Sequence, residues 1–448
     1  MVTAVVFEFG VMRCQPLRRA LAKQRITKLE ILLDNLKTTE ESNHFLRALW
    51  AKINEKYGKC AWNFMPYRNT SSRVILLGHM NIKEGLTLKV SVRYKNKGNL
   101  VAIIFEPTSE YLELELEFKE LRKLVKECQN YNGLINEYCF STQYELVRGN
   151  FSNYQGEYFS ITPLSGNIFE LVCKVKAYGK KDAEAIVTEK SSQIVNVLSV
   201  FSNGLILHNS ETVTCNGQLG ENNIYDLNHN WIDDRPLNNN KILITSKACQ
   251  LIDKILNSSS YNENLLLLLG AFSHFHSARS QDALEFDSLI PSKTIKKCDD
   301  RYTLTFEEDA RFRVAREIQK TATENASILY MSALEVISLV GADPAVKCQE
   351  CKQERYSISA RVQQYLKNNG AEALVKTIRD YYNLRSRYLH QGQLIKNHAY
   401  TGTTIPILDM DTQSHLNEFC QISVLNLREW CAHLLRQSLE TTSSDMFG

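Results

Sequence analysis

The sequence predicts an α+β protein, in which a mixed α/β N-terminal half precedes an all-helical C-terminal half. Short apolar runs in the first half have the length and alternation of strands, whereas apolar residues after Lys241 recur at helical spacing. A stretch rich in Asn, Asp and Gly separates the two patterns. We therefore expect a domain over 1–208, a linker or surface connection over 209–240, and a helical domain over 241–448.

Within the N-terminal half, helical and extended patterns follow one another. Two groups of apolar residues before position 65 recur at helical spacing: Leu29, Leu32, Leu33 and Leu36, then Phe45, Leu46, Leu49 and Trp50. Strands are expected between 73 and 117, with a hairpin turn at Gly98, and again over 137–176. Between these two sets of strands, the charged stretch 118–127 is expected to be a helix. An amphipathic helix is expected from Lys180 to Phe201.

The C-terminal half is predicted to be helical throughout. Apolar spacing and stop signals predict six helices, over 246–256, 262–285, 309–340, 357–368, 371–390 and 411–438. Connections between most of these segments are short, which predicts a compact helical domain.

Composition limits the classes of function. A chain of 448 residues exceeds the usual size of one core, and its net charge of +3 is too small to indicate nucleic-acid binding by itself. A basic stretch over 347–396 is either an electrostatic footprint for nucleic acid or a solvated helical surface. No glycine-rich phosphate loop occurs, so no nucleotide cofactor is expected. Apolar runs are too short for a membrane span, which needs about 20 residues.

Twelve cysteines are scattered through the chain, several of them inside apolar runs, where free cysteine packs as a small hydrophobe. The N-terminus has no basic leader before an apolar stretch, so we expect a protein of the reducing cytoplasm. Cys348 and Cys351 form a single C-x-x-C, whereas a zinc site needs four ligands. We expect no metal there, and a metal or redox clip is the alternative.

One motif points directly to a chemistry. Arg385, Ser386 and His390 form the string R-S-x-x-x-H near the end of a predicted helix that stops at Gly392. A guanidinium binds phosphate and an imidazole moves protons near neutral pH, so the pair predicts RNA cleavage without a metal. A second such string, Arg428 to His433, has the acidic Glu429 at its second position and lies among bulky apolar residues. We expect the second string to serve packing.

The C-terminal part, roughly 245–440, resembles a HEPN domain of the Apea-like subgroup. The resemblance rests on Arg385-Ser386-x-x-x-His390, on the aromatic approach that includes Tyr382, and on the small-Leu-Glu segment that ends at Glu335. The helix around 272–278 is also similar to the helical lead-in of this subgroup. In this chain Gln391 separates His390 from the glycine that the family often places directly after histidine.

The resemblance implies a metal-independent RNA endonuclease that leaves 2′,3′-cyclic phosphate ends. His390 would act as general base or acid, and Arg385 would hold the scissile phosphate. Ser386, Glu335 and Tyr382 are expected to support these two residues, with Glu335 more a structural partner than a catalyst. The further predicted RNA contacts are made by Arg379 and Arg387.

A homodimer through the helical domain is implied as well. Five helical steps separate Arg385 and His390 by about 140°, so one helix alone presents a poor site. HEPN nucleases typically build one composite cleft from two domains, and a two-fold pair would bring two copies of the motif together. Proteins of this kind commonly serve in anti-phage defence or as toxins, which implies an N-terminal sensing or inhibitory domain and a trigger derived from phage.

Two alternatives stay open. In the first, Arg385 only forms an ion pair with Asp380 or Glu335, and His390 only caps or packs its helix. In the second, the domain binds nucleic acid or a protein in a larger defence complex without cutting. His274 and His276 lie two apart on a predicted helix and point to different sides, so ordinary packing or surface roles are expected for them.

Overall fold

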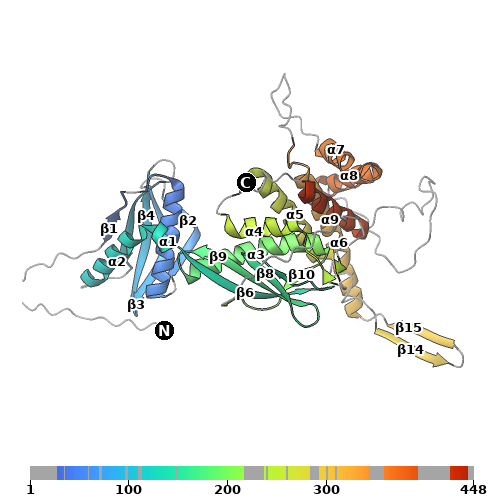
Figure 1. The fold of residues 1–448 in the computed structure, drawn as a ribbon, viewed down its shortest axis with the longest axis horizontal. Helices are drawn as coiled ribbons and strands as arrows, with labels where there is room; N and C mark the ends of the chain where they lie inside the picture. The colour runs from blue at the N-terminus through green and yellow to red at the C-terminus, as the bar shows by residue number, and fades with distance from the viewer. Residues whose placement is uncertain are drawn as a thin grey trace, which may run out of the picture. The chain divides into compact units, whose positions relative to one another are not determined.

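A computed structural model shows two compact units, Met1–Ile135 and Asn136–Gly448, and each is described by itself (Figure 1). The residues that the structure describes are 28–34, 36–58, 60–69, 73–95, 99–108, 114–147, 149–215, 237–238, 241–258, 261–282, 292–298, 301–307, 310–342, 358–391 and 424–441. The protein combines helices with antiparallel sheets, which confirms the predicted α+β class.

The first unit is built on a five-stranded antiparallel sheet in the order β1-β5-β4-β3-β2. Its strands are β1 (Leu29–Leu32), β2 (Cys60–Asn69), β3 (Val74–Lys83), β4 (Leu86–Tyr94) and β5 (Leu100–Pro107). In β4 the alternate residues Leu86, Leu88, Val90 and Val92 are all buried. This period of two places every apolar side chain of the strand on the same face, as a half-buried strand requires.

Two helices, α1 (Thr39–Tyr57) and α2 (Glu115–Cys128), contact each other and pack on the sheet of the first unit (Figure 1). Helix α1 begins at a capping box, in which the Thr38 hydroxyl accepts from the Glu41 N–H at 3.1 Å and the Glu41 carboxylate accepts from the Thr38 N–H at 3.1 Å. The helices bury Phe45 and Phe118 completely. Burial of these aromatic rings against the sheet forms the core of the unit.

The helical pattern predicted around Leu29–Leu36 is wrong. Leu29–Leu32 form strand β1, which pairs antiparallel with residues 102–105 of β5. Leu29 is buried, whereas Leu32 is 58 % exposed at the edge of the sheet. A segment this short satisfies helical and extended spacing equally, and the free edge of β5 decides between them because pairing there satisfies the backbone of both strands.

The second unit contains another antiparallel sheet, in the order β10-β6-β9-β8-β7, with β11 also paired to β6. Its strands are β6 (Asn136–Leu146), β7 (Tyr154–Gln155), β8 (Phe159–Pro163), β9 (Ile168–Ala177), β10 (Ile206–His208) and β11 (Val213–Thr214). The strands predicted over 137–176 are therefore present. Two short strands, β12 (Leu237–Asn238) and β13 (Lys241–Ile242), form a separate pair.

Seven helices described in the second unit are α3 (Lys180–Ser202), α4 (Ser246–Asn257), α5 (Glu263–Asp282), α6 (Ala310–Ile337), α7 (Ile358–Asn368), α8 (Val375–Gln391) and α9 (Val424–Thr441). The six helices predicted after Lys241 are confirmed with shifted ends, and 411–423 lies outside the described residues. Helix α3 contacts β6 and β9 of the sheet as well as α4, α5 and α9. It therefore joins the sheet to the C-terminal helices (Figure 1).

The predicted boundary at 209–240 does not separate two cores. A single hydrophobic cluster contains Phe140 and Phe169 of the second sheet, Phe201 of α3, and Phe272 and Leu434 of the C-terminal helices. The chain divides instead between Ile135 and Asn136. Because α3 buries side chains against both the sheet and the C-terminal helices, residues before and after 209–240 form a single core.

The prediction that everything after Lys241 is helical is also wrong. Strands β14 (Ser292–Cys298) and β15 (Arg301–Glu307) form an antiparallel hairpin between α5 and α6. In β15, Tyr302, Leu304 and Phe306 alternate with Thr303 and Thr305, a period of two that favours extended structure over the helix expected for the whole half.

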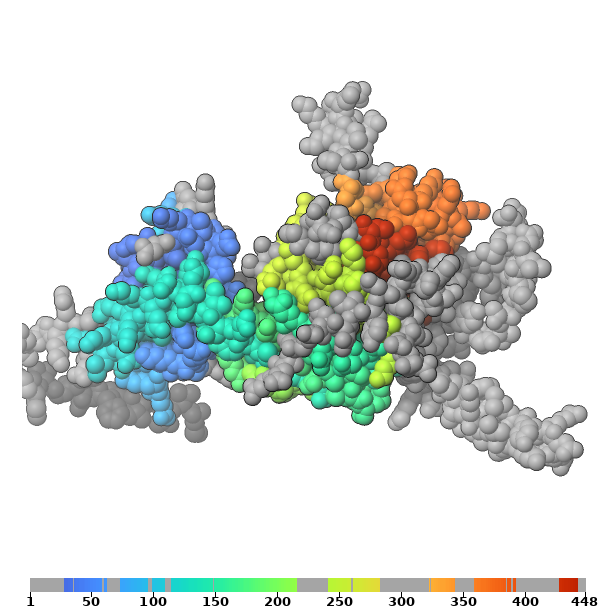
Figure 2. Space-filling view, in the orientation of Figure 1, coloured from blue at the N-terminus to red at the C-terminus, as the bar shows by residue number. Residues whose placement is uncertain are grey.

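Helices α7 and α8 lie on the surface of the second unit beside α9 (orange and red in Figure 2). The Tyr365 hydroxyl of α7 donates to the Leu434 carbonyl oxygen of α9 at 3.0 Å. None of the helices that the structure describes combines the length and the apolar character needed to cross a membrane.

Candidate functional site

Arg385 of α8 reaches across to α6 and is held there by two side chains. One guanidinium nitrogen, Nη1, forms a close ion pair with Glu335 Oε1, and Nη2 donates to the Ser332 hydroxyl at 3.2 Å. The Arg385 and Glu335 side chains are 17 % and 15 % exposed, so the pair is partly screened from solvent without being sealed from it. A guanidinium bound at two points loses little further entropy when it binds an anion.

Tyr382 lies one helical turn before Arg385 on α8. Its ring centroid is 6.0 Å from Arg385 Cζ, the outer limit for a cation–π contact. The Tyr382 ring therefore lies beside the guanidinium, and the supporting role expected for Tyr382 stays a prediction. Of the predicted supporting residues, the structure places both Tyr382 and Glu335 beside Arg385.

The positive charges of two arginines affect the pKa of the Glu335 carboxyl. Burial raises the pKa of its carboxyl, and the positive charges of Arg385 and then Arg361 oppose that rise. Arg361, on α7, donates from Nε to the Ser338 hydroxyl at 3.1 Å. Each arginine thus bonds a serine three residues from Glu335, Ser332 on one side and Ser338 on the other. Arg361 falls within the basic stretch 347–396, but its place beside Glu335 depends on the packing of α7 and has no local sequence signal.

The other motif residues are not joined to this cluster. Ser386, Arg387 and His390 are exposed on α8, and Arg379 is exposed beside Asp380, with its Nε 3.7 Å from Asp380 Oδ1. No contact within the described part of the chain joins the Ser386 or His390 side chain to Arg385. Of the two ion pairs considered as alternatives for Arg385, the structure shows the one with Glu335.

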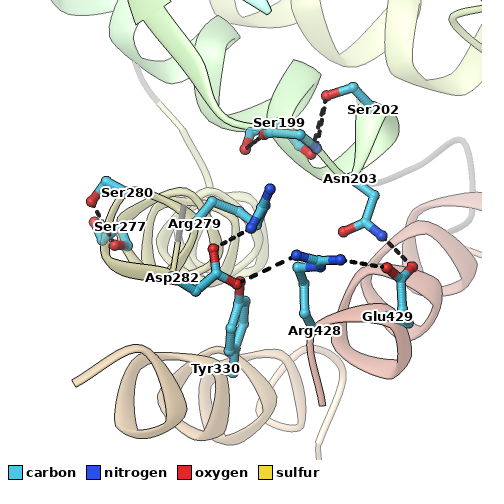
Figure 3. Close-up of polar contacts among 11 residues, drawn as sticks. Ser199, Ser202, Asn203, Ser277, Arg279, Ser280, Asp282, Tyr330, Arg428 and Glu429 are labelled. Atoms are coloured by element: carbon cyan, nitrogen blue, oxygen red, sulfur yellow. Dashed lines mark hydrogen bonds and ion pairs between the residues drawn. The ribbon is translucent and has the colours of Figure 1, made fainter. Parts of the chain in front are cut away.

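The second R-x-x-x-x-H string is packed against neighbouring helices, with Arg428, Cys431 and Ala432 buried and the other three residues half-buried, in agreement with the packing role predicted for it. The Arg428 side chain is 10 % exposed, its Nη2 donates to Glu429 Oε1 at 3.0 Å, and its Nη1 lies 3.8 Å from Asp282 Oδ2 (Figure 3). Glu429 in turn accepts a close hydrogen bond from the side-chain amide of Asn203, the residue that ends α3 in a left-handed conformation. The string therefore bridges α3, α5 and α9.

Asp282 is the centre of this network. It forms a close ion pair with Arg279 one turn earlier on α5, and its Oδ2 accepts from the Tyr330 hydroxyl of α6 at 2.5 Å (Figure 3). Burial raises the pKa of the Asp282 carboxyl, while the charges of Arg279 and Arg428 oppose the rise. This cluster has no local sequence signal, because its members come from four helices.

Metal ligands are not gathered anywhere in the described residues in groups of three or more His, Cys, Asp or Glu side chains. Cys348 and Cys351 lie outside the described residues, so the metal or redox alternative remains a prediction. Cys139 and Cys215, in contrast, are described as free thiols.

No protein-family model matches the chain, and no curated protein or solved structure is significantly similar to it.

Proposed function

We propose that this protein is a metal-independent RNA endonuclease whose site is organised around Arg385. The observation that carries the proposal is the guanidinium of Arg385, fixed at a helix junction by Glu335 and Ser332 yet still partly exposed. A positioned cation of this kind suits a scissile phosphate, because its charge stabilises the transition state without reorganisation during the reaction. The HEPN resemblance, with its histidine at His390, supplies the proton-transfer group.

In the proposed reaction, Arg385 binds a non-bridging phosphate oxygen and His390 transfers a proton. The ribose 2′-hydroxyl is the internal nucleophile, so the products carry a 2′,3′-cyclic phosphate and a 5′-hydroxyl. Ser386, exposed and next to Arg385 on α8, would bond a phosphate oxygen. The exposed Arg379 and Arg387 would contact the RNA backbone on either side.

A homodimer through the helical domain is part of the proposal. His390 lies on α8 about 140° around the helix from Arg385, and only Arg385 turns inward to α6. A two-fold contact along α8 would bring His390 of each copy towards Arg385 of the other. We propose that such a dimer acts in the cytoplasm in anti-phage defence or as a toxin, with no cofactor.

The N-terminal part is proposed to restrain the nuclease until a phage-derived trigger arrives. Because residues 136–208 share a core with the C-terminal helices, a deletion that tests this must end at Ile135 rather than at residue 208. Removal of residues 1–135 should make the protein toxic without its trigger. Toxicity and trigger dependence that stay as in the full chain would contradict the regulatory role.

The cleavage assay uses end-labelled RNA in EDTA, with wild type, Arg385→Ala and His390→Ala. Both variants should lose cleavage by about 10²-fold or more, because each removes a group that acts in the transition state. His208→Ala is the matched control, since His208 is another exposed histidine of the same unit. A substrate with a single 2′-deoxynucleotide at the cut site should resist. Equal cleavage by all four proteins would refute the assignment.

A second function, non-catalytic binding of RNA or a partner protein, is favoured by one observation. Both Nη atoms of Arg385 are engaged by Glu335 and Ser332, and His390 stands apart from that cluster. An ion pair that only stabilises the fold of a non-catalytic binding domain would show the same contacts. Binding of the labelled RNA without any product in the assay above would favour this function over the nuclease.

A further inference from the structure

Helices α5 and α6 pack antiparallel with a register that three contacts define. Near one end, the Gly341 N–H just after α6 donates to Asn264 Oδ1 of α5 at 3.3 Å. In the middle, a Cβ placed on Gly270 would lie 3.7 Å from Val336 Cγ1. Towards the other end, the ring of Phe275 lies 5.4 Å from that of Tyr330. Each step of some residues forward along α5 therefore corresponds to a step of the same number of residues back along α6.

This register brings His274 to the level of Ser332. His274 follows Gly270 by one helical turn on the same face of α5, and Ser332 precedes Val336 by one turn on the same face of α6. Because Gly270 faces Val336, His274 lies one turn further along the same interface, at the level of Ser332. Ser332 is the residue whose hydroxyl accepts from Arg385 Nη2. Arg385, Ser332 and His274 thus converge from α8, α6 and α5.

The protonation state of His274 suits a proton acceptor near Arg385. Burial and, next, the positive charge of Arg385 lower the pKa of its imidazole. At neutral pH the ring is therefore uncharged and has a free nitrogen lone pair, which is the form that accepts a proton. His274 is half-buried, so part of the residue still reaches solvent.

We propose that His274 is a further catalytic residue of the Arg385 site, the group that removes the proton from the ribose 2′-hydroxyl. This inference rests on the proposed nuclease function and divides the proton transfers between two histidines. The 2′-hydroxyl proton moves to the unprotonated nitrogen of His274 as the 2′ oxygen bonds to phosphorus. The bond from phosphorus to the 5′ oxygen breaks, and that oxygen takes a proton from the protonated ring of His390.

The first test compares His274→Asn and His274→Gln with a matched control, His276→Asn, in single-turnover cleavage. Neither amide exchanges a proton, so both His274 variants should cleave about 10²- to 10⁴-fold more slowly than wild type. His276 is also half-buried on α5, and burial and Arg279 lower its pKa as well, but it lies about 200° around the helix from His274. His276→Asn should cleave at the wild-type rate, with thermal unfolding used to confirm that all three variants fold.

The second test separates the two proton transfers with a substrate that has sulfur in place of the 5′ oxygen at the cut site. A thiolate leaves without protonation, so this substrate should restore cleavage by His390→Ala. The same substrate should not restore cleavage by His274→Asn, because the 2′-hydroxyl must still lose its proton. Equal restoration of both variants would overturn the role given to His274.

The outcomes distinguish the inference from the function on which it rests. Wild-type rates in both His274 variants, with cleavage lost in Arg385→Ala and His390→Ala, would overturn the role of His274 and leave the nuclease standing. No cleavage by wild-type protein in any RNA tested would remove both. Loss of cleavage in both His274 variants, without rescue by sulfur, would establish His274 as the proton acceptor.

Discussion

The guanidinium of Arg428 lies 3.8 Å from the carboxylate of Asp282 in the interior of the second unit, between α9 and α5. Asp282 is 2 % exposed and also binds Arg279 and Tyr330. The carboxylates of Asp282 and Glu429 therefore balance the positive charges of Arg279 and Arg428. Taking such groups out of water is expensive, so the network is stable only as long as every partner is present.

Loss of the Asp282 charge should destabilise the protein strongly. In Asp282→Asn, Arg279 and Arg428 stay buried with one carboxylate fewer between them, at an expected cost of about 3–5 kcal/mol in the free energy of unfolding. Urea unfolding followed by circular dichroism measures it. Glu184→Gln is the matched control, because it removes half of an exposed pair with Lys181 and should cost no more than about 0.5 kcal/mol. Similar losses in both variants would contradict a special role for the buried network.

Asp253 should make the protein less stable as pH rises. Its Oδ1 is buried without a hydrogen-bond partner among the described residues, and burial, followed by the charge of Glu157, raises its pKa from 3.8 to about 6. As pH rises, Asp253 loses its proton at a lower pH in the unfolded chain than in the folded protein. Its contribution to the free energy of unfolding therefore falls between about pH 4 and 6 and stays low above pH 6. Asp253→Asn should therefore stabilise the protein at pH 8 by about 1 kcal/mol, a figure discounted for solvent screening.

The measurement for Asp253 is thermal unfolding of both proteins from pH 4 to 8. The variant should gain stability relative to wild type as pH rises and should gain nothing at pH 4, where Asp253 is protonated in the folded protein. A stability difference that does not change over this range would show that Asp253 is not the titrating group.

Cys139 and Cys215 should form a disulfide under mild oxidation. The antiparallel register of β11 on β6 continues to this pair, and the Cys215 N–H donates to the Cys139 carbonyl oxygen at 3.1 Å. Residues opposite one another in such a pair have Cα atoms about 5.5 Å apart, within the range that disulfides span. Both thiols are partly exposed. Glutathione disulfide would oxidise them and be reduced to two glutathione molecules.

Peptide mapping of non-reduced protein by mass spectrometry detects the link between Cys139 and Cys215. Cys215→Ser should abolish the linked peptide, whereas Cys60→Ser, which removes a partly exposed thiol of the first unit, should leave it unchanged. Absence of the linked peptide in wild-type protein, with glutathione adducts on both cysteines instead, would contradict the register of β11.

Gly78 should be intolerant of any side chain. It has a φ of 154°, and a Cβ there would lie 1.9 Å from the Ala61 carbonyl oxygen of the neighbouring strand β2. Because the obstacle is backbone, Gly78→Ala must separate β2 from β3, with an expected loss of about 2 kcal/mol or more. Gly133→Ala is the control, since its Cβ would meet only the Asn130 side chain at 3.7 Å. Urea unfolding should show a clear loss for the first variant alone.

Much of the secondary structure was predictable because it follows from local periodicity. The alternation in 137–176 and the helical spacing in 180–201 survive in β6, β8, β9 and α3, where one side of each element is buried. The helical prediction for Leu29–Leu32 was wrong because four residues are too few to show a period. The hairpin over 292–307 was missed because a single helical assignment was extended over the whole second half.

For the site, the sequence alone determined the residue types and their order along α8: an arginine, a serine and a histidine after an aromatic approach. Its spacing also predicts that Tyr382 lies beside Arg385, because residues three or four apart on one helix are neighbours. Glu335 was expected near Arg385 only from the resemblance to HEPN domains.

Only the tertiary structure decided which partners Arg385 has. Its contacts with Ser332 and Glu335 span 53 and 50 positions of sequence. The charge of Arg385 also acts on His274 of α5, and Arg361 of α7 acts on Glu335. The tertiary structure also decided where the two units divide, between Ile135 and Asn136, and which residues surround Asp282. The physical reason is the same in each case: burial depends on which helix faces pack together, and no stretch of local sequence contains both faces.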